Sequence, residues 1–106
     1  MPRRVKPASS AAPSGRPWFV YLLECRNGRL YAGVTVDLAQ RFAQHRSGKG
    51  AMFTRLNTPE RMLAARPCTS HSEALKLEVQ VKRLSPQSKR QLAAQWSLQL
   101  PLAPAA

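Results

Sequence analysis

The sequence predicts a small α+β domain in which a three-stranded antiparallel sheet is flanked by helices, in the order β-β-α-β-α-α. Two segments rich in β-branched and aromatic residues, 18–24 and 29–34, surround Asn27-Gly28, a pair that is typical of a hairpin. Later segments begin with helix-capping residues and carry apolar residues at helical spacing. With 106 residues, the chain fits one such domain.

The length of the hairpin loop decides which side chains share a face, because the side chains of a strand alternate with a period of two. A two-residue loop would place Tyr21 and Tyr31 on opposite faces. A three-residue loop over 26–28, with Gly28 in the left-handed conformation, instead collects four residues on one face: Tyr21, Leu23, Tyr31 and Gly33. The other face then holds a continuous apolar set: Trp18, Val20, Leu22, Leu30, Ala32 and Val34. We expect the three-residue loop for that reason.

The first helix is predicted over residues 38–47, because Asp37 before it is a good N-cap. Residues 48–59 are rich in basic and turn-forming types, and we expect them to form a basic loop. The third strand is predicted over 61–66 and is expected to end at Pro67.

The second helix is predicted to begin at a capping box made by Ser70 and Glu73, and its apolar stripe runs to Leu84. Ser85 then acts as an N-cap with Pro86 at the first helical position. A third helix is therefore expected to run to about residue 96.

The two ends of the chain differ in composition from the rest. Residues 1–17 contain basic, Pro, Ala and Ser residues without an acid, so we expect a disordered basic arm. Residues 97–106 are expected to form a flexible tail, which leaves 18–96 as the folded domain. The arm also bears a weak resemblance to a transit peptide, an alternative that stays open, although we expect a cytoplasmic location.

Charge and cysteine content restrict the function. The net charge of +12 favours a polyanionic partner, with nucleic acid first and an anionic membrane surface second. The longest apolar run, 18–23, is far shorter than the roughly 20 residues that span a bilayer, and no amphipathic basic helix supports membrane binding. Cys25 and Cys68 lack a zinc-binding spacing and are interpreted as buried or idle thiols of a reducing compartment.

Four residues are candidates for catalytic chemistry, although each also has an ordinary structural explanation: Tyr21, Tyr31, Arg41 and His45. Arg41 and His45 are four residues apart and so share one helix face, which could simply be a solvated polar face. Tyr21 and Tyr31 could be half-buried strand tyrosines.

Glu78 is a fifth candidate, because it lies at the edge of the apolar stripe of the second helix. Carboxylates avoid such places unless they are paired. An ion pair with Lys82 on the same helix is the structural alternative.

Together these positions resemble the GIY-YIG endonuclease domain. The resemblance rests on Val20-Tyr21-Leu22, Tyr31-Ala32-Gly33, Arg41, His45 and Glu78, and it covers about residues 18–90. The segment Ser47-Gly-Lys-Gly-Ala51 makes the chain similar to the small stand-alone bacterial members. Neither signature is spelled in full, and Val34 stands where several members have a catalytic lysine.

This resemblance implies metal-dependent hydrolysis of nucleic-acid phosphodiesters, with Mg²⁺ or Mn²⁺ and no small-molecule cofactor. Glu78 would be the metal ligand. Tyr21 would be the general base or would orient the attacking water, which requires a lowered phenol pKa. Tyr31 would hold the water and Arg41, Arg41 would bind the scissile phosphate, and His45 would exchange protons at a near-neutral pKa.

Seven cations are expected to contact phosphates, with DNA preferred over RNA: Lys49, Arg55, Arg61, Lys82, Arg83, Lys89 and Arg90. Each could equally be a solubilising charge. A catalytically silent nucleic-acid-binding module is the main alternative function, and a small ribosome-associated protein is a second.

The geometry of the domain can distinguish these functions. For a nuclease, Tyr21 and Tyr31 must share a face, Arg41 and His45 must converge there, and Glu78 must reach the same concavity. Tyrosines on opposite faces, or a Glu78 pair with Lys82 far from Arg41, would favour the binding module.

Overall fold

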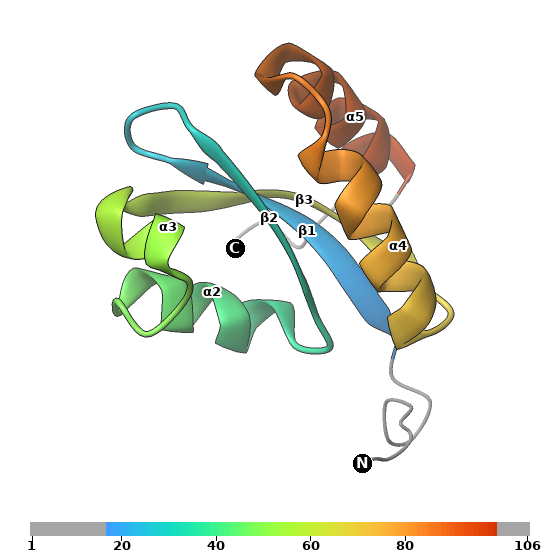
Figure 1. Ribbon diagram of the computed structural model, residues 1–106, viewed down its shortest axis with the longest axis horizontal. Coiled ribbons are helices and arrows are strands. Elements are labelled where there is room, and N and C mark those ends of the chain that lie inside the picture. The colour runs from blue at the N-terminus through green and yellow to red at the C-terminus, as the bar shows by residue number, and fades with distance from the viewer. Residues whose placement is uncertain (1–16, 100–106) are drawn as a thin grey trace.

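The computed structural model describes residues 17–99, which form one sheet with helices on both sides (Figure 1). In chain order the elements are β1 (Trp18–Cys25), β2 (Leu30–Thr35), α2 (Leu38–Arg46), α3 (Met52–Leu56), β3 (Pro59–Cys68), α4 (His71–Lys82) and α5 (Pro86–Gln99). The predicted α+β class and element order are confirmed. Most of the predicted basic arm, residues 1–16, and the end of the predicted tail, residues 100–106, lie outside the described residues.

The hairpin has the three-residue loop. Tyr21 lies opposite Gly33 and Leu23 opposite Tyr31, and the Gly28 N–H donates to the Cys25 carbonyl at 2.9 Å. Gly28 has a φ of +84°, the left-handed conformation that the turn requires. The two tyrosines therefore share one face of the sheet.

The three strands form an antiparallel sheet in the order β2-β1-β3, with β1 in the centre. The third strand is longer than predicted at both ends. It begins at Pro59 and continues through Pro67, which was expected to end it. An edge strand tolerates proline because one side of its backbone needs no ladder hydrogen bonds.

The two faces of the sheet have different partners. One face, with Val20, Leu22 and Ala32, packs against Ala74 and Val81 of α4 and against Ala93 and Trp96 of α5, and this is the predicted apolar side. The other face carries a smaller cluster of three buried residues: Tyr21, Leu23 and Ala65. Figure 1 shows α2 and α3 on this second side. The tyrosine face is therefore covered by α2, which carries the predicted Arg41 and His45, and by α3.

The expected helix starts are confirmed by their caps. The side chain of Asp37 accepts from the Gln40 N–H at 3.0 Å, and Ser70 Oγ accepts from the Glu73 N–H at 3.0 Å. Helix α5 continues to Gln99, past the expected end at residue 96. No helix within residues 17–99 is long and apolar enough to cross a membrane.

Helix α3 corrects the prediction of a basic loop over 48–59. Five residues are too few to show a helical period, so the sequence pattern could not reveal it. Tertiary contacts hold the turn: Phe53 stacks on Tyr31 with ring centroids 5.7 Å apart, and Thr54 bonds to His45.

Candidate functional site

Tyr21 is the centre of the candidate site. It lies on β1, is fully buried, and its Oη is 2.8 Å from His45 Nε2. Arg41 donates from Nε to the same oxygen at 3.3 Å. Because Arg41 and His45 are one helical turn apart on α2, both reach the tyrosine from one helix face. The structure therefore brings these three predicted residues together.

His45 is held on its other side by a residue that the sequence analysis missed. Thr54 of α3 is 2% exposed, and its Oγ1 is 2.7 Å from His45 Nδ1. Gly50 lies against the same ring, since a Cβ there would be 2.9 Å from both Cγ and Cε1. Neither contact could be read from spacing, because both depend on how residues 47–54 fold back over α2.

Burial shifts two pKa values away from those expected. Burial, with a smaller effect of the nearby Arg41 charge, lowers the pKa of His45 to about 4. Burial raises the pKa of Tyr21 to about 12, although the Arg41 hydrogen bond opposes it. The lowered phenol pKa that a free tyrosinate base requires is thus absent from this structure, and both groups are neutral at pH 7.

Tyr31 lies beside this group through ring contacts. Its ring centroid is 5.2 Å from that of His45, in an edge-on arrangement, and 6.4 Å from that of Tyr21. On β2, Gly33 leaves the space that the Tyr21 ring fills, because a Cβ there would be 2.6 Å from Tyr21 Cζ. These tilted rings thus form an aromatic wall on one side of the site.

Glu78 approaches from α4, which packs on β1 and β2. Its side chain is 16% exposed and forms the alternative ion pair, with Lys82 Nζ 3.4 Å from Oε2. The pair is not remote from the tyrosines: the Glu78 charge contributes to the raised pKa of Tyr21, and Lys82 Nζ is 5.9 Å from the Tyr31 ring centroid. The carboxylate thus stands beside the aromatic wall.

The site offers a divalent cation one carboxylate, that of Glu78. No group of three His, Cys, Asp or Glu residues capable of holding a metal occurs within residues 17–99. Glu78 is a single partly buried oxygen donor, which suits Mg²⁺ because that ion keeps several waters and often takes one carboxylate together with substrate phosphate. The residues present therefore fit a cation bound jointly with substrate.

The seven predicted phosphate-binding cations divide into groups. Three of them lie near the candidate site. Lys49 directly precedes Gly50, which lies against the His45 ring, and Arg55 lines a hollow together with His45. Lys82 lies over the Tyr31 ring. Arg83 caps the C-terminus of α4 and is exposed, and Lys89 lines a groove under the hairpin loop.

The remaining two, Arg61 and Arg90, bind Glu24 on the opposite face of the sheet. Arg61 Nε is 2.7 Å and Arg90 Nη1 2.6 Å from the Glu24 carboxylate. Arg90 also donates to the Gly28 carbonyl at 2.7 Å. Their charge thus ties β3 and α5 to the hairpin.

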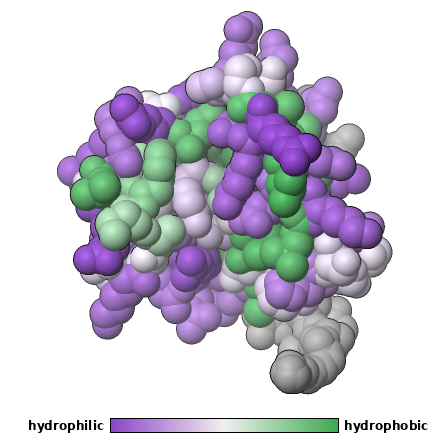
Figure 2. All heavy atoms as spheres, in the orientation of Figure 1, coloured by the Kyte–Doolittle hydropathy of each residue, from purple (hydrophilic) through white to green (hydrophobic). Residues whose placement is uncertain are grey.

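Exposed apolar side chains of α3 and α4 flank the candidate site. Figure 2 shows a mostly hydrophilic surface interrupted by green atoms over α3 and α4. The exposed apolar residues there are Met52 and Leu56 of α3, which are 64% and 76% exposed, and Leu75 and Val79 of α4.

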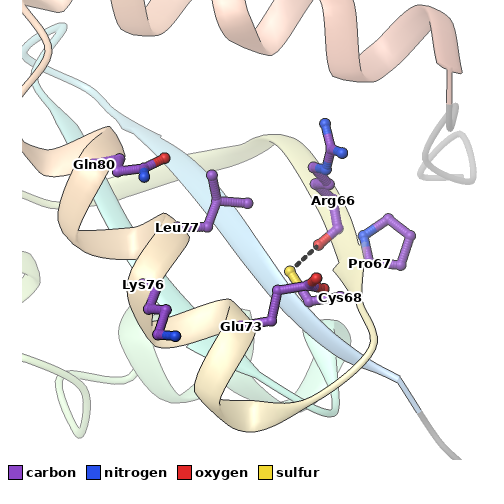
Figure 3. Close-up of a pocket in the computed structure, with 7 residues that line it drawn as sticks. All are labelled: Arg66, Pro67, Cys68, Glu73, Lys76, Leu77 and Gln80. Carbon is purple, nitrogen blue, oxygen red and sulfur yellow. Dashed lines mark hydrogen bonds between the residues drawn. The ribbon is translucent and has the colours of Figure 1, made fainter.

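A separate hollow of about 330 Å³ lies between α4 and the end of β3, lined by Arg66, Pro67, Cys68, Glu73, Lys76, Leu77 and Gln80 (Figure 3). It contains none of the predicted site residues. Cys68 and Cys25 are free and buried, as expected, and burial raises the pKa of both thiols. These thiols are therefore poor nucleophiles at neutral pH.

The sequence over the folded residues matches a known class of catalytic domain. The model of the GIY-YIG catalytic domain matches residues 17–91, so the chain belongs to the GIY-YIG family, as its motifs predict. This is a family associated with nucleases and nucleic-acid substrates.

The particular relatives are small bacterial proteins named UPF0213. One from Cupriavidus necator is 50% identical over 78 residues, which cover 74% of this chain and 85% of that protein. One from Cupriavidus pinatubonensis is 53% identical over 70 residues, covering 66% and 78%. The solution NMR structure of the protein EF2693 from E. faecalis is 32% identical with a TM-score of 0.54, covering 77% of this chain and 88% of that one.

Proposed function

We propose that this protein is a divalent-metal-dependent endonuclease that hydrolyses phosphodiester bonds, in DNA in preference to RNA. The observation that carries the proposal is the bonded group Arg41-Tyr21-His45 with the Glu78 carboxylate beside it. We further propose a cytoplasmic location, where thiols such as Cys25 and Cys68 stay reduced.

Arg41 would bind the scissile phosphate. Its Nε bonds to Tyr21 and its Nη1 donates to Gln44 Oε1 at 2.8 Å, which fixes the guanidinium plane. A fixed planar donor stabilises the charge that develops on phosphate oxygens in the transition state. Lys49, Arg55, Lys82 and Arg83 would contact neighbouring phosphates.

Tyr21 would act as a proton conduit rather than as a free tyrosinate. With a pKa of about 12 it is protonated, and its hydroxyl is 2.8 Å from a neutral imidazole. As the attacking water loses a proton to Tyr21 Oη, the original phenolic proton would pass to His45 Nε2. The resulting hydroxide would form the new P–O bond while the bond to the leaving oxygen breaks, and the leaving alkoxide would take a proton from solvent.

Glu78 would hold the Mg²⁺ or Mn²⁺ ion when substrate is present. The cation supplies positive charge at the phosphate and lowers the pKa of a nearby water. Lys82, which now pairs with Glu78, would turn to phosphate when the cation takes the carboxylate.

Plasmid cleavage with purified Glu78→Gln tests this function, with Mg²⁺ or Mn²⁺ and with branched and single-stranded substrates in parallel. We expect loss of at least about 10²-fold in rate with an unchanged circular-dichroism spectrum. Glu24→Gln is the matched control, because it removes a carboxylate from the other face and should cleave like the wild type. Equal cleavage by wild type and Glu78→Gln would refute the assignment. Metal-independent binding without cleavage would favour the binding module.

A further inference from the structure

The hydrogen-bond directions around His45 follow from its partner Thr54. A threonine hydroxyl has one hydrogen, and a carbonyl oxygen can only accept. Thr54 Oγ1 donates to the Ala51 carbonyl at 2.9 Å, so its hydrogen is already used. The contact of 2.7 Å between Thr54 Oγ1 and His45 Nδ1 must then be donated by the ring. His45 therefore carries its hydrogen on Nδ1.

This tautomer leaves the Nε2 lone pair of His45 facing Tyr21. The tyrosine hydroxyl must donate across the 2.8 Å contact, while Arg41 Nε donates to the tyrosine oxygen at 3.3 Å. The donors run in one direction, from Arg41 through Tyr21 and His45 to Thr54 and the Ala51 carbonyl. In the opposite tautomer Nε2 would donate to the Tyr21 oxygen, so the phenolic hydrogen would lose His45 as its acceptor, and Thr54 would have to turn its own hydrogen from the Ala51 carbonyl to Nδ1.

The ring of His45 is also confined sterically. A Cβ at Gly50 would overlap Nδ1, so only glycine allows the backbone to approach the ring here. His45 is 1% exposed, so bulk water does not compete with Thr54 for Nδ1. The segment from Gly50 to Thr54 thus fixes both the position and the tautomer of the imidazole.

We propose that Thr54 is a positioning residue that holds His45 in the Nδ1–H tautomer, so that Nε2 accepts the phenolic proton of Tyr21. Gly50 serves the same end by leaving room for the ring. The catalytic part of this inference rests on the proposed nuclease function, whereas the tautomer does not. The role resembles that of the partner which orients a catalytic histidine in hydrolases, performed here by a neutral hydroxyl.

Histidine ¹⁵N NMR on the full chain at pH 7 tests the tautomer directly. We expect the wild type and Thr54→Ser to show the Nδ1–H form, and Thr54→Val to show a mixture or the Nε2–H form. A wild-type Nε2–H signal for His45 would overturn the proposal whether or not the protein cleaves nucleic acid. If Thr54→Val fails to fold, the wild-type signal and Thr54→Ser still decide the question.

Cleavage assays test the consequence. We expect Thr54→Val to lose about 10- to 100-fold in kcat with little change in KM, and Thr54→Ser to restore most of it. The pH profile of Thr54→Val should also shift, which a purely structural loss would not cause. Thr58→Val, an exposed threonine in the same region, is the matched control and should behave like the wild type.

The two proposals can fail separately. If the wild type cleaves and Thr54→Val cleaves equally with an unchanged tautomer, the positioning role is wrong although the nuclease function stands. If the wild type cleaves nothing but shows the Nδ1–H form that Thr54→Val loses, the nuclease function fails and the role of Thr54 in holding His45 stands.

Discussion

A single methyl group added at Gly33 should displace the centre of the site. Gly33 lies opposite Tyr21 in the hairpin, and a Cβ there would be 2.6 Å from Tyr21 Cζ. Carbon atoms pack at about 3.5 Å or more, so the Gly33→Ala variant must move the Tyr21 ring edge by about 0.9 Å. The hydroxyl would then leave its 2.8 Å contact with His45.

Two measurements follow from this displacement. Overpacking of a buried ring should lower the free energy of unfolding by about 1–3 kcal/mol, measured by urea denaturation. A shift of about 1 Å in a reacting group should reduce cleavage by about 10²-fold under conditions where the variant is folded.

Gly28→Ala is the matched control for Gly33→Ala. It forces a left-handed alanine, at a cost of about 1–2 kcal/mol, but its Cβ would meet nothing within 4 Å. It should therefore lose similar stability and keep its cleavage rate. A Gly33→Ala protein as stable and as active as the wild type would refute the argument from packing.

Two further predictions concern protonation and charge. Because folding lowers the pKa of His45 from 6.5 to about 4, the unfolded chain takes up a proton first as the pH falls. Urea denaturation should thus show about 2 kcal/mol less stability at pH 5 than at pH 7.5, and His45→Gln should remove most of that difference. DNA affinity should fall by roughly 10³-fold or more between 50 and 200 mM salt. In the same titration, Arg55→Gln should reduce the slope of log affinity against log salt concentration by about one. Arg61→Gln should reduce it by less, because the Arg61 guanidinium already binds Glu24. A DNA affinity of the wild type that does not change with salt would exclude nucleic acid as the partner.

Much of the fold could be predicted because its signals are local. The alternation of side chains and the Asn27-Gly28 pair determine the hairpin register, and Asp37 and Ser70 determine where two helices begin. Helix α3 could not be predicted, because its single turn depends on contacts with residues far away in the sequence. The extension of β3 through Pro67 likewise depends on its place at the sheet edge.

The site divides in a similar way. The sequence placed Tyr21 and Tyr31 on one face and Arg41 with His45 on one helix side, since both follow from short periods. It could not show that Glu24 forms ion pairs with Arg61 and Arg90, because the three residues come from three separate elements. The same limit applies to the pairing of Glu78 with Lys82 beside the tyrosines, where spacing predicted the pair but not its location.

The residue types that could do chemistry, and the face of each element that they occupy, follow from the sequence. Their protonation states and hydrogen-bond partners depend on the packed structure. Burial between the sheet and the helices α2 and α3 raises the pKa of Tyr21 and lowers that of His45. The expected tyrosinate base is therefore a neutral tyrosine that is hydrogen-bonded to a neutral histidine. Such shifts depend on desolvation, which is a property of the packed surroundings, and the threonine that fixes the histidine is brought there by the fold of a segment with no periodic signal.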